Sequence, residues 1–101
     1  MASQEELQGI LETLLGKKHV YYQPPENLTM EYPAIRYSLV DIESIYANNA
    51  KYSNRRRYEI IVIDKLPDND VIQKILALSY SSFDRRYVTN NLNHDVITLY
   101  F

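Results

Sequence analysis

The chain of 101 residues has no cysteine and no tryptophan, and only two glycines, four prolines and two histidines. The absence of cysteine excludes disulfide bonds, thiol catalysis and cysteine-ligated zinc. With so little glycine and proline, and no repeat or low-complexity segment, the chain has little linker material. The longest aliphatic run, "IIVI" at 60–63, is far too short to cross a bilayer, and the amino terminus lacks the pattern of a signal peptide. We therefore expect a single domain over residues 1–101 that makes no contact with a membrane.

The net charge and the aromatic content limit the classes of partner that the chain is expected to bind. The formal net charge is −2, with acidic and basic residues interleaved along the chain. A domain built to hold phosphate backbones usually shows a basic balance or one dense basic face, so tight nucleic-acid binding is disfavoured. Ten tyrosines stand against two phenylalanines. Tyrosine buries a large ring and keeps a polar tip, which suits subunit contacts, but it is equally an ordinary strand residue.

Two segments have the apolar spacing of helices. The first begins with Ser3 and Glu6 in a capping-box arrangement and ends at Gly16, which is followed by two lysines. Its apolar face consists of Leu7, Ile10, Leu11, Leu14 and Leu15. The second spans 66–79, with Asp68 or Asn69 as the cap and Asp70 in the first turn. Its apolar face consists of Val71, Ile72, Ile75, Leu76 and Leu78.

The remaining segments read as strands. A short strand is expected at 19–23, and a strand at 33–40 that continues through 42–47 to a turn at Asn48-Asn49. The return strand, 51–63, would be on the order of 40 Å long at roughly 3.3 Å per residue, so its polar first half would project beyond a compact core. Strands at 84–90 and 94–101 follow, linked by the asparagine-rich 90–93. This order predicts an α+β fold: a mainly antiparallel sheet, two helices on one face and a long projecting hairpin.

The polar residues do not form a recognisable active site. His94 is followed by Asp95, but neighbours on a strand point to opposite faces, so they cannot act together. Ser81, Ser82 and Asp84 lack the glycine pattern of a nucleophile elbow and are read as a loop. No glycine-rich phosphate loop is present. We therefore expect a protein that is not an enzyme, with no catalytic residue, metal site or cofactor.

Three consecutive arginines in the expected hairpin leave three interpretations open. Strand alternation places Arg55 and Arg57 on one face and Arg56 on the other. They can be solvated charges that pair with Asp41 or Glu43 on the opposite strand. They can instead enter a groove on a partner protein, since tyrosine and arginine are enriched at such contacts, or they can contact nucleic acid. The candidate interface residues are Tyr46, Asn48, Asn49, Tyr52, Arg55, Arg56 and Arg57.

Residues 32–101 carry a series of motifs in a characteristic order. They are "YPAIRY", "YANNAKY", "YEIIVIDKLP" and the ending "FDRRYVTNNLNHDVITLYF". In this order they resemble the small tail-terminator and head–tail joining proteins of long-tailed bacteriophages, and the ending is the most specific part. Asn48 and Asn90 stand where the family pattern has aspartate.

The resemblance implies a sheet flanked by helices that assembles as a six-membered ring. Such a ring caps the finished tail tube, ends its polymerisation and presents a surface to the connector of the head. The implied partners are further copies of the chain, the tail tube protein and the head connector, with DNA only passing through the lumen. The implied location is the virion, after assembly in the bacterial cytoplasm. The alternative is a small α+β module that binds nucleic acid or peptide.

Overall fold

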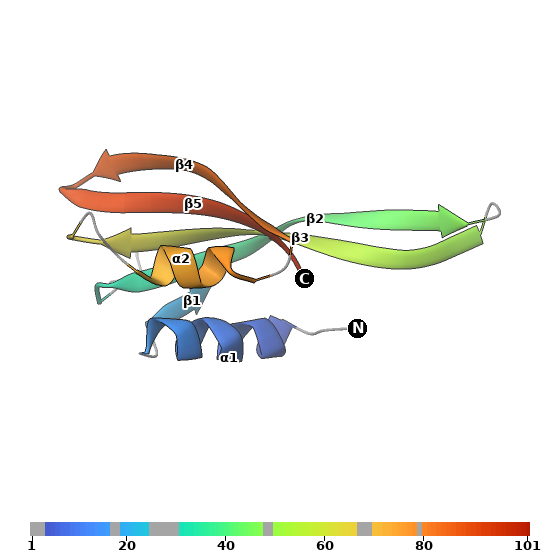
Figure 1. Cartoon of the computed structure of the whole chain (residues 1–101), viewed down its shortest axis with the longest axis horizontal. Helices are drawn as coiled ribbons and strands as arrows, with labels where there is room; N and C mark the ends of the chain where they lie inside the picture. Colours follow the sequence, from blue (N-terminus) through green and yellow to red (C-terminus); the bar gives the residue numbers. More distant parts are fainter. Residues whose placement is uncertain (1–3, 17–18, 25–30, 48–49, 67–69, 79) are drawn as a thin grey trace.

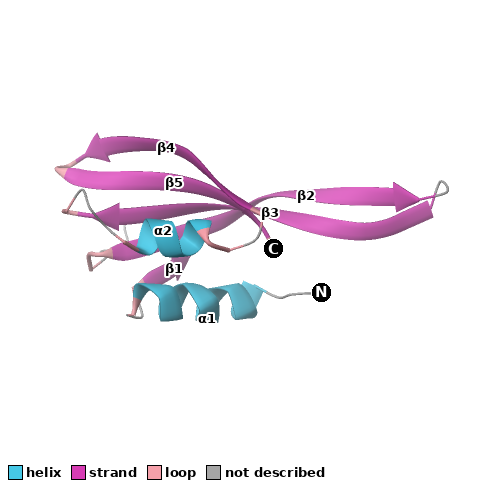
Figure 2. Ribbon diagram, viewed as in Figure 1, coloured by secondary structure: helices cyan, strands magenta, loops and turns pink. Residues whose placement is uncertain are grey.

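The computed structural model describes residues 4–16, 19–24, 31–47, 50–66, 70–78 and 80–101, with the backbone alone at 43–47 and 50–55. Its elements are α1 (Gln4–Leu15), β1 (Val20–Tyr22), β2 (Ala34–Ala47), β3 (Ala50–Asp64), α2 (Val71–Leu76), β4 (Ser81–Thr89) and β5 (Leu92–Tyr100). The strands form one sheet in the order β1-β2-β3-β5-β4, in which only β1 and β2 run parallel (Figures 1 and 2). The predicted α+β fold, mainly antiparallel and with a long projecting hairpin, is confirmed.

The core lies between the two helices and one face of the sheet (Figure 1). Alternate residues of the central strands point toward the helices because successive side chains of a strand face opposite ways. Both helices contribute to the same cluster, so they cover the same face as predicted. The buried members are Leu7, Leu11, Val20, Ile35, Tyr37, Tyr58, Ile60, Val62, Val71, Ile72, Ile75, Ile97 and Leu99.

The predicted helix ends are partly confirmed. Gly16 follows α1 with a φ of 76°, a left-handed conformation in which glycine has no steric penalty. Ser3, proposed as the cap of α1, lies outside the described residues, as do Asp68 and Asn69. The bounds 66–79 for the second helix are wrong: α2 begins at Val71, and Asp70 is its N-cap residue without a side-chain cap hydrogen bond. The helix stops early because the Leu78 amide bonds to the Ile75 carbonyl, a tighter turn that closes the last carbonyls.

The interpretation of Ser81, Ser82 and Asp84 as a loop is wrong. All three belong to β4, and the first two pair with Leu99 and Thr98 of β5. The ladder accommodates Asp84 through a register shift between Phe83 and Arg85, the mark of a β-bulge. The predicted strand 84–90 is confirmed over 84–89 as part of β4, but sequence periodicity misses the start of the strand because the bulge breaks the two-residue repeat.

The expected link at 90–93 is shorter than predicted. Asn90 and Asn91 alone form the turn, with φ values of 53° and 61°, and Leu92 already starts β5. Two consecutive left-handed residues match the twist of a tight hairpin, and asparagine is among the few residues that tolerate them.

The first strand forms the parallel pair of the described sheet. β1 runs parallel to β2, with Val20 opposite Ile35. The residues 23–33 between them provide the roughly dozen residues that a parallel return needs. In the part of the chain that the structure describes, no helix is long and apolar enough to cross a membrane.

Candidate subunit interface

Residues 41–47 and 50–57 form a two-stranded ribbon, here called the projecting arm. β1 pairs with β2 only as far as Tyr37, and β5 pairs with β3 only as far as Arg57. Beyond these points, apart from one hydrogen bond between Phe101 and Arg56, the described residues of the two strands pair only across the arm (Figure 1). The molecule is accordingly elongated, with extents of 50 × 25 × 23 Å. The arm adds roughly 23 Å at 3.3 Å per residue over seven residues.

The base of the arm is held by two backbone contacts with the body and by one ion pair within the arm. The amide of Phe101 donates a hydrogen bond of 2.9 Å to the carbonyl of Arg56. Arg57 stands opposite Tyr100 in the ladder and lies 3.9 Å from the carboxylate of Asp41. The predicted pairing of Arg57 with Asp41 is therefore confirmed. The Nε of Arg57 is buried and has no hydrogen-bond partner among the described residues, so the Asp41 carboxylate does not satisfy every donor of this guanidinium.

The part of β3 that continues from the arm into the body is buried in the core. Tyr58, Ile60 and Val62 of β3 are at most 1% exposed and face the helices. The ring of Tyr58 lies 6.1 Å from that of Tyr37, centroid to centroid, in a tilted arrangement favourable for aromatic pairs. The arm is thus an extension of strands that the core fixes in place.

The structure places five of the seven candidate interface residues along the arm. Tyr46, Tyr52 and Arg55 lie in its strands, where only the backbone is described, and the register sets Arg55 opposite Glu43. Arg56 and Arg57 stand at its base and are half-buried. Asn48 and Asn49 lie outside the described residues.

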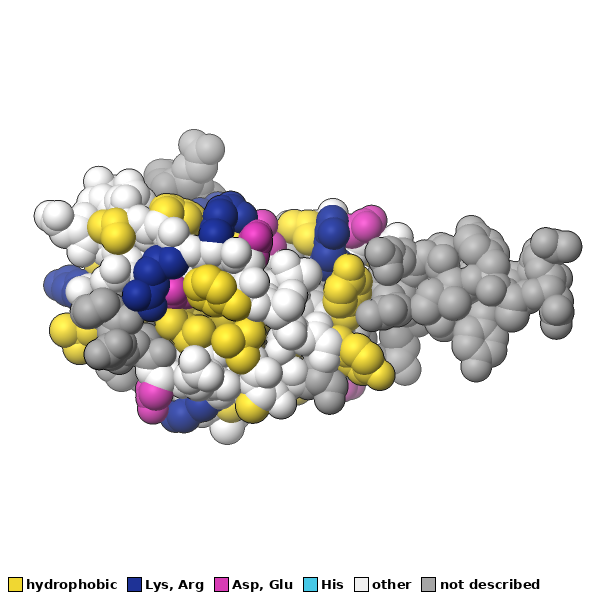
Figure 3. Space-filling model, turned by 45° about the horizontal axis from the view of Figure 1, so that its top comes forward, with side chains coloured by type: hydrophobic (Ala, Val, Ile, Leu, Met, Phe, Trp, Pro, Cys, Tyr) yellow, Lys and Arg dark blue, Asp and Glu magenta, His cyan; other side chains and the backbone are white. Residues whose placement is uncertain are grey.

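A second exposed surface was not singled out from the sequence. β4 is an edge strand, and every residue from 82 to 89 is exposed. It carries Phe83, Tyr87 and Val88, which are 47%, 39% and 64% exposed. Figure 3, which turns the β4 side forward, shows hydrophobic side chains interspersed with Lys and Arg. The sequence signal for this surface is the set of apolar and aromatic residues among the arginines of 83–88.

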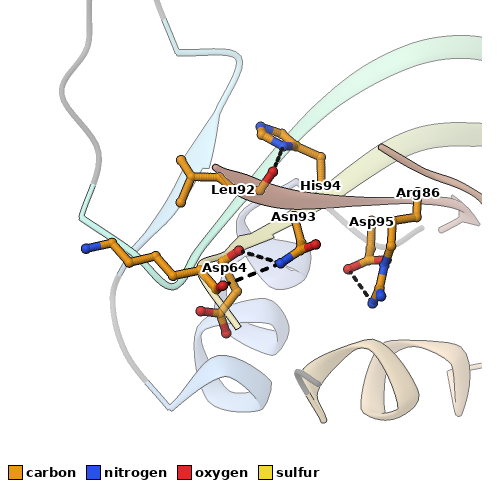
Figure 4. Close-up of polar contacts among 7 residues, drawn as sticks. Asp64, Arg86, Leu92, Asn93, His94 and Asp95 are labelled. Atoms are coloured by element: carbon orange, nitrogen blue, oxygen red, sulfur yellow. Dashed lines mark hydrogen bonds and ion pairs between the residues drawn. The ribbon is translucent and has the colours of Figure 1, made fainter. Parts of the chain in front are cut away.

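The polar residues of the last hairpin hold its two strands together (Figure 4). The Arg86 guanidinium bonds both carboxylate oxygens of Asp95, at 2.5 and 3.2 Å, and Asp95 is only 3% exposed. His94 lies on the other side of β5: its Nδ1 donates to the Leu92 carbonyl at 3.0 Å and its ring stacks on Tyr87. The prediction that His94 and Asp95 face opposite ways is confirmed. Each is engaged in a contact that supports the hairpin.

One tyrosine joins α1 to the sheet. The hydroxyl of Tyr37 donates to Gln8 Oε1 and accepts from Gln4 Nε2. Burial raises the pKa of Tyr37 above its ordinary value of 10.0, although the hydrogen bond from Gln4 opposes the shift. These contacts fix the position of the amino-terminal half of α1 on the sheet.

The two histidines are separated by the sheet order. His19 precedes β1 at one edge, where its Nε2 lies 2.9 Å from the carboxylate of Glu31, while His94 lies in β5 beside the other edge. Across the described ranges, no group of three or more His, Cys, Asp or Glu side chains is placed to hold a metal ion.

Comparisons with known proteins add no assignment to this geometry. A scan against models of protein families finds none that matches the chain, and a search of curated proteins finds no relative. The arm, the β4 edge and the covered sheet face are therefore the features from which a function has to be argued.

Proposed function

We propose that this chain is a structural assembly protein of a tailed bacteriophage. Copies of it form a ring, six-membered by the resemblance of its motifs, that caps the tail tube, ends its polymerisation and joins the tail to the head connector. The observation that supports this most is the projecting arm. Among the described residues, the two strands pair only with each other from Arg55 outward, and no described residue of the arm belongs to the core under the helices.

A bare two-stranded ribbon is marginally stable in water. The arm therefore gains most if another protein covers it. The arm and the helices lie at different places on one protomer (Figure 1), so an arm that docks on the next copy leaves that copy's own arm unoccupied. Such a heterologous contact repeats, and it closes into a ring when the rotation between neighbours is right.

The charge of the chain fits a ring through which DNA slides. A formal net charge of −2 gives no general attraction for phosphates. The basic residues of the arm then serve contacts with protein, and DNA passes through the lumen without being held. Virion location follows from this role.

Electron microscopy tests the proposal directly. The purified chain is mixed with a tail tube protein, and the lengths of the tubes are measured with and without it. We expect ring-shaped particles and tubes that stop growing when one end is capped. A chain that stays monomeric at every concentration, and leaves tube length unchanged, contradicts the proposal.

Charge reversal in the arm tests whether the arm makes the contacts that build the ring. Arg55→Glu with Arg57→Glu is expected to weaken ring formation roughly tenfold or more, because it reverses the charge of the arm. The unfolding midpoint should change little, since these residues lie outside the core. The matched control reverses two exposed cations of the body, Arg36→Glu with Lys65→Glu, and should leave assembly unchanged. Normal assembly of the arm variant would return its arginines to solvated surface.

The β4 edge supports a second candidate, a module that binds peptide or nucleic acid. An exposed edge strand can accept an extended peptide as a sixth strand. Tyr87, stacked on His94 with the Arg85 guanidinium 5.9 Å from its ring centroid, can stack against a base. A monomer that shifts an oligonucleotide at physiological salt, and forms no ring, would favour this candidate over the assembly role.

A further inference from the structure

The outer face of α1 carries a shallow, open groove lined by Glu6, Gly9, Ile10, Thr13 and Leu14. Ile10 and Leu14 are only half-buried there, so the groove has apolar walls that the described residues do not fully cover. The Thr13 hydroxyl donates back to the Gly9 carbonyl at 2.9 Å, which leaves the groove without a free hydroxyl donor. The surface is therefore suited to packing against another protein.

Gly9 has no evident role within the protomer. It lies in the middle of α1 with ordinary helical backbone, and a Cβ added to it would meet nothing within 4 Å. A glycine inside a helix costs about 0.5–1 kcal/mol relative to alanine. Because Gly9 has no side chain, the backbone or an aromatic ring of another protein can approach the helix closely. Close approach by a partner would therefore explain glycine at this position.

The charges of the exposed surfaces indicate which of them docks in this groove. α1 contains Glu5, Glu6 and Glu12 and no basic residue, which gives it a charge of −3. The projecting arm contains four basic residues, Lys51 and the three arginines, against Asp41 and Glu43, which gives it +2. The exposed β4 edge has two arginines and one aspartate, so its charge has the same sign as that of the arm. The arm of a second copy is thus attracted to α1 and not to β4.

We propose that the projecting arm of one protomer docks into the α1 groove of the next, with its backbone or a tyrosine ring over Gly9 and its basic residues beside Glu6. This rests on the proposed ring and names the two surfaces that build it. The arm supplies a ribbon that needs cover, and the groove supplies apolar walls, a close approach and charge of the opposite sign. Because the two surfaces are distinct, the contact is heterologous, as ring closure requires.

Substitution of Gly9 separates folding from assembly. Gly9→Gln should leave the unfolding midpoint of the isolated chain unchanged or higher, because glutamine is a good helix former and its Cβ meets no atom. The same change should weaken ring formation roughly tenfold or more, because the side chain fills the groove. The matched control is Val88→Gln on the β4 edge, which should leave assembly unchanged.

Disulfide cross-linking tests where the contact lies. Because the chain contains no cysteine, only the introduced cysteines can form a disulfide. A Gly9→Cys chain is mixed with a Tyr52→Cys chain and oxidised, and the disulfide-linked dimer is measured on a non-reducing gel. A Val88→Cys chain replaces the Gly9→Cys chain as the control. We expect a dimer from the first mixture and little from the second.

The outcomes distinguish this inference from the ring itself. Rings that form while Gly9→Gln assembles normally, or while Val88→Cys is the cysteine that links to the arm, overturn the α1 contact and leave the ring in place. A wild-type chain that never forms a ring overturns both. Rings that Gly9→Gln weakens, with linkage between positions 9 and 52, support the contact.

Discussion

The body and the projecting arm are built from the same two strands, yet different forces hold them. In the body, Tyr37 of β2 and Tyr58 of β3 are buried under the helices, and β1 and β5 extend the sheet on either side. In the arm, β3 continues with the polar sequence of 51–57, and beyond the base the described residues of the two strands pair with each other. Burial of side chains fixes the body, whereas backbone pairing between the two strands is the contact that the structure describes along most of the arm. Because a bare two-stranded ribbon is marginally stable in water, the arm is expected to contribute little to the stability of the isolated chain.

The largest difference is expected between two tyrosines six residues apart on β3. Tyr58→Ala removes a ring that is 1% exposed and leaves a cavity, which should lower the free energy of unfolding by about 3–5 kcal/mol. Tyr52→Ala, in the arm, should change it by less than about 0.5 kcal/mol and instead weaken assembly. Urea denaturation of the isolated chains measures the first effect, and sedimentation measures the second. Equal losses of stability would show that the arm folds as part of the body.

The sequence predicted the body better than its edges. The apolar faces of the helices and the alternation of Ile35 and Tyr37 are periodic, and periodic burial is what a single sequence displays most clearly. The turn at Asn90-Asn91 was placed within an asparagine-rich link, but its length depends on the register of the ladder. β4 was missed at its start because the bulge at Asp84 interrupts the repeat.

The candidate site was only partly predictable. The length and polarity of 51–57 indicated an arm, and the structure places it there. The groove at Gly9 carried no signal, because a glycine within an apolar helical pattern looks like a tolerated exception. Only the observation that a Cβ would meet nothing shows that the protomer does not require glycine. A contact between copies is not encoded in the periodicity of one chain.

A smaller difference is expected between two ion pairs, one in the body and one at the base of the arm. Asp95→Asn removes the charge that binds Arg86 in a bidentate pair, and should cost about 1–3 kcal/mol of unfolding free energy because Asp95 is buried. Asp41→Asn should cost less than about 0.5 kcal/mol, because Asp41 and Arg57 are 45% and 40% exposed and 3.9 Å apart. Chemical denaturation of both variants measures the difference. A cost at Asp41 as large as that at Asp95 would mean that the base of the arm is part of the core.

The smallest effect is expected at high pH, in the contribution of the Tyr37 hydroxyl to the stability of the body. Burial raises the pKa of Tyr37 in the folded chain above its ordinary value of 10.0, so between the two values the unfolded chain releases a proton that the folded chain keeps. The stabilisation is complete below pH 10 and is lost as the pH rises through the folded pKa. Tyr37→Phe cannot titrate, so the stability difference between wild type and this variant should shrink above pH 10. Urea denaturation of wild type and Tyr37→Phe from pH 8 to 11 measures this difference, and a constant difference would show that the Tyr37 hydroxyl ionises in the folded chain as readily as in the unfolded one.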